Sequence, residues 1–124
     1  MNRTNVIQLS PRSPFQNRTD DWKSICYERV GFRIFVFNIK NTTQLTRNAR
    51  YTVYTPNTEL TYSGNSYFPV LLADADHRPL TSTYHAHIMI EWVGGSQYSF
   101  DLYTGNTSIP VNTEISFVLV TLQY

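Results

Sequence analysis

Apolar and polar residues alternate along most of the chain from Ser24 onward, and clusters of Gly, Pro, Asn and Asp separate the alternating stretches. A period of two is typical of β-strands, and no stretch keeps a helical period for more than a turn or two. The pattern predicts strands at residues 24–30, 32–39, 50–55, 59–62, 67–73, 82–92, 97–103 and 114–124. We therefore expect an all-β fold, either an antiparallel β-sandwich or a jelly-roll-like barrel of about seven to eight strands.

Two of these predicted strands, 32–39 and 114–124, are apolar on both faces. In the second, Ile115 and Phe117 fall on one face, while Val118 and Val120 fall on the other. A strand of this kind is usually covered on both sides, so the last strand should lie inside a sheet or against another subunit. The predicted oligomer interface comprises Phe117, Val118, Val120 and Leu122.

The strand at 67–73 contains Pro69, which favours an edge position or a bulge. A tight hairpin is expected at Gly94-Gly95. Residues 1–23 contain Pro11 and Pro14 and show no sustained alternation. We interpret this segment as an extended N-terminal arm that precedes a β-sandwich domain at 24–124.

Composition adds to the β prediction, because aromatic residues reach 15% and charged residues only 15%. The formal net charge is +1 with no basic run, so nucleic acid is not expected as a partner. No secretory signal is visible and no apolar run approaches the ~20 residues of a membrane span, so membrane insertion is not expected. Cys26 is the only cysteine and is expected to be a buried thiol.

The sequence lacks a phosphate-binding glycine loop, a nucleophile elbow and a CxxC pair, and we expect neither an enzyme nor a bound cofactor. His85-Ala86-His87 would place two imidazoles on one side of a strand, in a row with Met89 and Glu91. This spacing is similar to the iron-binding His-x-His motifs of some trimeric phage spikes, which implies a metal on a threefold axis. The alternative is a polar sheet face or a subunit contact.

Two further features have a functional and a structural interpretation. Asp74-Ala75-Asp76 resembles the start of a calcium loop but lacks its later Gly and Glu, which favours a solvated turn. Aromatic residues beside polar turns can stack on sugar rings, and the residues predicted to bind a ligand in this way are Trp92, Tyr62, Tyr67, Tyr103 and Asn65. Each aromatic side chain could instead belong to the core.

From Tyr27 to Tyr124 the layout resembles the C-terminal heads of viral attachment proteins, such as phage receptor-binding proteins and adenovirus-type fibre heads. The resemblance rests on a strand pair divided by Gly31, a Pro-containing strand at 67–72, a long strand with a Gly-Gly hairpin, and an apolar last strand. It implies a homotrimer in the virion that binds a host-surface glycan or protein. No shaft repeat precedes the head, which favours the alternative of a small virion decoration or a tail- or capsid-attached protein, anchored to other virion proteins by its arm.

Overall fold

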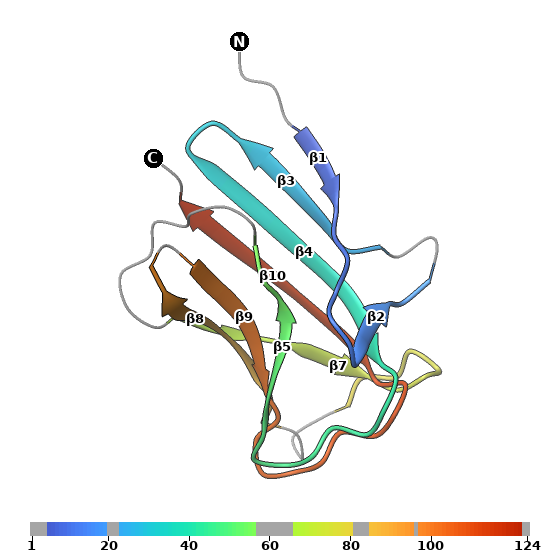
Figure 1. Cartoon of the computed structure of the whole chain (residues 1–124). Helices are drawn as coiled ribbons and strands as arrows, with labels where there is room; N and C mark the ends of the chain where they lie inside the picture. The colour runs from blue at the N-terminus through green and yellow to red at the C-terminus, as the bar shows by residue number, and fades with distance from the viewer. Residues whose placement is uncertain (1–4, 20–22, 57–65, 81–84, 96, 123–124) are drawn as a thin grey trace.

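The computed structural model describes residues 5–19, 23–56, 66–80, 85–95 and 97–122, and these residues form ten strands and no helix (Figure 1). The strands are β1 (Asn5–Gln8), β2 (Phe15–Asn17), β3 (Ile25–Arg29), β4 (Phe32–Asn41), β5 (Arg50–Tyr54), β6 (Ser66–Pro69), β7 (Leu71–Ala73), β8 (His87–Gly94), β9 (Gln97–Tyr103) and β10 (Glu114–Leu122). Within this part of the chain, no helix could cross a membrane.

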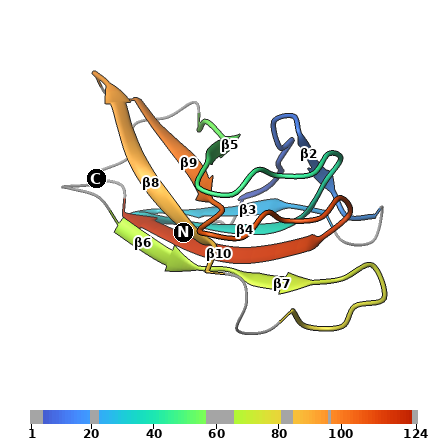
Figure 2. The same cartoon turned by 90° about the horizontal axis from the view of Figure 1, so that it is seen from below.

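The strands form two antiparallel sheets. The large sheet has the order β1-β3-β4-β10-β7, and β2 pairs with the far end of β4. The small sheet has the order β5-β9-β8-β6. Figure 2 shows β8 and β9 of the small sheet rising away from the large sheet, while β6 lies beside β10. The predicted all-β antiparallel sandwich is therefore confirmed, with ten strands in place of seven to eight.

Part of the difference in strand number arises at Pro69-Val70. The predicted strand at 67–73 is two strands, because β6 pairs with β8 in the small sheet and β7 pairs with β10 in the large sheet. The chain thus passes from one sheet to the other at Val70. β6 is the last strand of its sheet, which confirms the edge position expected for Pro69, since proline has no N–H to donate to a further strand.

The other part of the difference comes from the segment expected to be an arm. β1 pairs with β3 and β2 pairs with β4, so residues 5–8 and 15–17 are strands of the large sheet. Leu9 and Phe15 are buried in the core, at 2% and 4% exposed. These two apolar side chains hold the segment against the domain, although it shows no alternation that would predict a strand.

The core lies between the sheets and is rich in aromatic rings. Phe35 and Phe37 of β4 face Phe100 of β9, at ring-centroid distances of 4.9 and 6.1 Å. Phe117 of β10 stacks on Phe37 at 4.7 Å. The register that pairs Phe117 with Phe37 and Leu119 with Phe35 places these side chains on the inner face of the large sheet.

One predicted strand differs clearly in extent from the structure. The strand expected at 82–92 is β8 at His87–Gly94, and the longest strand is β4 with 10 residues. The strand expected at 59–62 lies outside the described residues. The hairpin expected at Gly94-Gly95 joins β8 to β9, and both glycines have positive φ, 125° and 56°, which glycine adopts without steric cost.

Candidate functional site

The outer faces of the two sheets differ in chemistry. The outer face of the large sheet carries apolar side chains from four neighbouring strands, β1, β3, β4 and β10. We call this set the apolar face: Val6, Ile25, Tyr27, Phe32, Ile34, Val36, Val118, Val120 and Leu122. Val6, Tyr27, Val118, Val120 and Leu122 count among the exposed large apolar residues of the chain.

Strand register makes the apolar face continuous. Val118 lies opposite Val36, which lies opposite Ile25, and the next level joins Val120, Ile34 and Tyr27 in the same way. Four strands about 4.8 Å apart and three side-chain levels about 6.8 Å apart give a patch of roughly 400 Å². Patches of this size on a single chain often mark an interaction site.

The edge of the apolar face carries both signs of charge. Lys40 and Glu114 lie opposite each other at one end of β4 and β10, and Arg29 lies at the other end opposite Phe32. Beside β10, Pro69, Leu71, Phe117 and Val118 line a shallow groove with Ser116. An apolar centre with a mixed-charge rim is the usual anatomy of a protein–protein contact.

The structure separates the four residues predicted as an oligomer interface. Val118, Val120 and Leu122 are exposed on the apolar face. Phe117 points to the opposite side and is 4% exposed, because it pairs with Phe37 and stacks on that ring in the core. Phe117 is thus a core residue, and its prediction as an interface residue is corrected.

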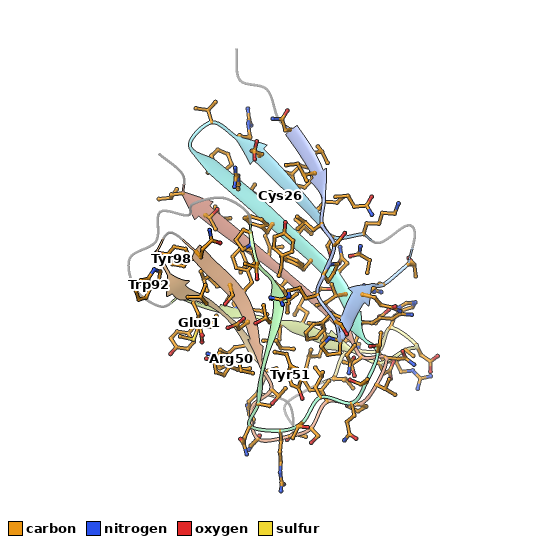
Figure 3. The ribbon with its side chains drawn as sticks, viewed as in Figure 1. Cys26, Arg50, Tyr51, Glu91, Trp92 and Tyr98 are labelled. Carbon is orange, nitrogen blue, oxygen red and sulfur yellow. The ribbon has the colours of Figure 1, made fainter. Side chains whose placement is uncertain are left out.

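The outer face of the small sheet is polar and aromatic. Six side chains from its four strands form what we call the polar cluster: Arg50, Tyr67, His87, Glu91, Asp101 and Tyr103. Arg50 Nη1 donates to Glu91 Oε2 at 2.7 Å, and the Tyr103 hydroxyl donates to Glu91 Oε1. Arg50 Nε lies 3.8 Å from Asp101 Oδ2, which is an ion pair rather than a hydrogen bond. Figure 3 shows Glu91 and Arg50 as neighbours on this sheet.

Three rings form the other half of the polar cluster. His87 stacks parallel on Tyr103, with ring centroids 5.2 Å apart, and Tyr67 lies 5.3 Å from His87 on the other side. Tyr67 belongs to the edge strand β6 and is 67% exposed. The row therefore ends in an aromatic ring that is open to solvent.

Asp101 is the buried member of the cluster. Its side chain is 3% exposed, and its Oδ1 accepts no hydrogen bond. Burial raises the pKa of Asp101, and the negative charge of Glu91 raises it further, while the hydroxyls of Thr52 and Ser99 partly offset the shift. Asp101 and Ser99 both lie on the outer face of β9, and both are buried.

Of the residues predicted to bind a ligand, the structure brings Tyr67 and Tyr103 together through His87. Trp92 is 63% exposed but alternates with Glu91 along β8, so it points away from the polar cluster, and its Nε1 donates to the Gly95 carbonyl at 2.7 Å. Figure 3 shows it beside Tyr98. Tyr62 and Asn65 lie outside the described residues.

The two histidines predicted to hold a metal do not share a strand. His85 precedes β8 and is exposed, whereas His87 is the first residue of β8 and lies between two tyrosine rings. Within the described ranges, no three His, Cys, Asp or Glu side chains are grouped as metal ligands would be. The structure gives His87 a stacking role in one chain, and a metal on a threefold axis stays a prediction.

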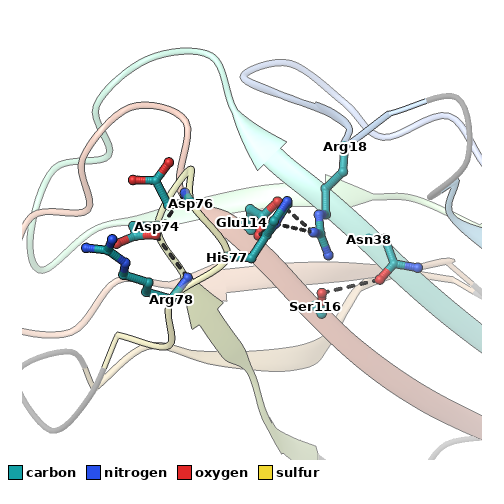
Figure 4. Close-up of polar contacts among 8 residues, drawn as sticks. All are labelled: Arg18, Asn38, Asp74, Asp76, His77, Arg78, Glu114 and Ser116. Atoms are coloured by element: carbon teal, nitrogen blue, oxygen red, sulfur yellow. Dashed lines mark hydrogen bonds and ion pairs between the residues drawn. The ribbon is translucent and has the colours of Figure 1, made fainter.

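The Asp74–Arg78 segment is a closed turn after β7 (Figure 4). Asp74 Oδ1 accepts hydrogen bonds from the backbone N–H groups of Asp76 and Arg78, at 2.9 and 3.0 Å. Glu114 of β10 binds Arg18 at 2.6 Å and His77 at 2.7 Å. These contacts fasten the turn to the large sheet, in agreement with the turn interpretation of Asp74-Ala75-Asp76.

Sequence reasoning placed His87 and Glu91 on one row but missed Arg50. Arg50 and Glu91 are 41 residues apart, and only the pairing of β5 and β8 with β9 brings them together. The fold is an antiparallel β-sandwich with one apolar and one polar outer face. Comparison with models of protein families, with curated proteins and with solved structures found no match.

Proposed function

We propose that this chain is a non-enzymatic module of a viral particle, which self-associates as a homotrimer and presents a receptor-binding surface to the host. The observation that carries the proposal is the apolar face, which spans four adjacent strands of the large sheet. Covering roughly 400 Å² of apolar surface favours association, and a stable contact buries about 800 Å² per partner when its polar rim is included.

A second copy of the same chain is the partner that best suits this face. The face has no charged side chain at its centre, and Glu114 at its rim is buried and already paired with Arg18 and His77. Apolar surfaces match without paired charges, and around a threefold axis one part of this face contacts another part of the same face on the next copy. The small net charge of +1 adds little repulsion between copies.

The alternative role, a virion decoration anchored by a free arm, has less support. Residues 5–8 and 15–17 are strands of the large sheet, and Leu9 and Phe15 contribute to the core. Removing residues 1–23 would therefore take core side chains away from the domain. Anchoring through the open edge of β1 remains compatible with this arrangement, because all four of its residues are exposed.

The mass of the chain in solution tests the proposal. Sedimentation or light scattering over a dilution series should give about 43 kDa, which is three times the 14.4 kDa chain. Val118→Asp should raise the dissociation constant by about a hundredfold or more, because a carboxylate in an apolar contact loses its hydration. Val93→Asp is the matched control, since Val93 is also a strand valine and the two are 59% and 54% exposed.

A single-chain mass at every concentration would overturn the proposal, and a two-chain mass would overturn the trimer. The assignment to a virion has its own test. Antibodies against the chain should label intact particles purified from its source, and labelling confined to non-particle fractions would contradict it.

A further inference from the structure

The polar cluster on the small sheet has the chemistry of a ligand site, and it lies on the layer opposite the apolar face. Strands β5, β6, β8 and β9 each contribute to it, so its backbone is held by three strand pairings. A rigid sheet that presents exposed polar and aromatic side chains is suited to binding without rearrangement of the main chain.

The charges of the cluster indicate what kind of ligand it takes. One guanidinium, Arg50, stands against two carboxyl groups, Glu91 and Asp101. Positive charge is therefore not in excess, which disfavours a carboxylate, sulfate or phosphate ligand. Arg50 is 57% exposed, so those of its N–H groups that do not contact Glu91, Tyr103 or Asp101 are available to a neutral acceptor.

The buried oxygen of Asp101 is the second observation. Oδ1 accepts no hydrogen bond although the side chain is 3% exposed. Buried polar atoms are rarely left without a partner, so this oxygen is a candidate acceptor for a hydrogen-bond donor on a ligand. Arg50, the exposed ion-pair partner of Asp101, lies 3.8 Å from the other carboxylate oxygen, Oδ2, and a ligand that binds Oδ1 would need the Arg50 side chain to change rotamer.

A hydroxyl group satisfies both requirements, since it accepts from a guanidinium and donates to a carboxylate. An anionic group can only accept, and an ammonium group can only donate. Tyr67, exposed at the end of the ring row, offers a face for the C–H side of a sugar ring. The arrangement of hydroxyl-binding groups beside an open aromatic ring matches one ligand class, which is a carbohydrate without charge.

We propose that the polar cluster binds an uncharged sugar, with Tyr67 stacking on its ring and Arg50, Glu91 and Asp101 binding its hydroxyl groups. This inference names the ligand class of the receptor-binding surface and rests on the proposed function for its role in attachment. Binding itself needs only the small sheet of one chain. It also moves the ligand site away from Trp92, which points to the other side of β8.

A glycan array with the full chain tests this inference, with uncharged glycans and sialylated or sulfated glycans as the two arms. Uncharged glycans should bind. Tyr67→Ala and Arg50→Gln should each weaken binding about tenfold or more, in a titration of the best uncharged glycan. Both side chains are mainly exposed, so neither variant removes a core residue. Trp92→Ala is the matched control, because Trp92 is an equally exposed aromatic residue of the same sheet and should leave binding unchanged.

Binding confined to charged glycans, or no binding to any glycan, would overturn the inference. So would loss of binding in Trp92→Ala with normal binding in Tyr67→Ala. The two proposals fail separately. A three-chain mass together with no glycan binding on the array would contradict only the sugar site. A bound uncharged glycan on a single-chain protein removes only the self-association.

Discussion

Replacement of Asn41 should be far more damaging than its small size suggests. Asn41 ends β4 and is completely buried. Its Nδ2 donates to the carbonyl oxygens of Thr43 and Pro110, at 2.8 and 2.7 Å, and its Oδ1 accepts from the Thr113 N–H at 2.9 Å. The side chain thus joins the end of β4 to the loop that leads into β10.

Asn41→Asp keeps the shape of the side chain but replaces the donor nitrogen by an oxygen. The Thr43 carbonyl oxygen and the new carboxylate oxygen are then left without a donor, while the Pro110 carbonyl oxygen keeps the hydroxyl of Thr113. Each buried polar group left without a partner costs about 1–3 kcal/mol, so the variant should lose about 2–6 kcal/mol of unfolding free energy. A domain of this size has about 5–15 kcal/mol in total, so the loss is a large part of its stability.

Urea unfolding measures the effect, and its pH dependence tests the cause. The buried site disfavours the new carboxylate, so the folded variant binds a proton more tightly than the unfolded chain, and its stability should recover as the pH falls. Asn106→Asp is the control, because Asn106 is exposed in a turn. Stability of Asn41→Asp within about 0.5 kcal/mol of the wild type would refute the reasoning.

Three further changes test other parts of the structure. Phe117→Ala should cost about 3–5 kcal/mol in urea unfolding of the single-chain Val118→Asp background, and an effect below 1 kcal/mol would contradict the core position of Phe117. The pKa of Asp101 is raised mainly by burial and further by Glu91, against the opposing hydrogen bonds of Thr52 and Ser99. The folded chain therefore binds a proton that the unfolded chain releases, and stability falls as the pH rises from about 4 through the folded pKa. Asp101→Asn should flatten this slope, and an unchanged slope would exclude Asp101 as its source. Burial raises the pKa of Cys26, so a thiol reagent at neutral pH should modify it only when urea unfolds the chain, and rapid modification of the folded chain would contradict its burial.

The fold class could be predicted because strand periodicity is a local property of the sequence. Which face of a strand points into the core is not a local property. Along 114–122 both faces are apolar, and the pattern cannot tell which of Phe117 and Val118 points inward. The register with β4 decides it, since Phe117 lies opposite Phe37 and Leu119 opposite Phe35 on the side of the small sheet. Phe117 and Leu119 are larger than the valines on the other face, and they fill the space between the two sheets.

The start of the chain illustrates a second limit of sequence reasoning. Residues 5–17 join the large sheet through two short strands and two buried side chains, Leu9 and Phe15, with prolines between them. Short strands of this kind show no full period of alternation. The polar cluster shows the same limit, because the Arg50–Glu91 contact depends on the pairing of three strands. No pattern in the sequence around Arg50 or around Glu91 indicates this contact.

The two outer faces explain why a sandwich can combine assembly with binding. Each sheet buries its inner face in the shared core, so the outer residues can change without loss of the fold. On the large sheet these positions are apolar, which favours contact with further copies, and on the small sheet they carry the polar cluster. In the proposed oligomer, copies that associate through one layer leave the opposite layer accessible, so several of the proposed sugar sites would act together on one host surface. Linked sites of this kind gain about 10²–10⁴ in overall avidity without any new contact, which removes the need for a deep pocket on the single chain.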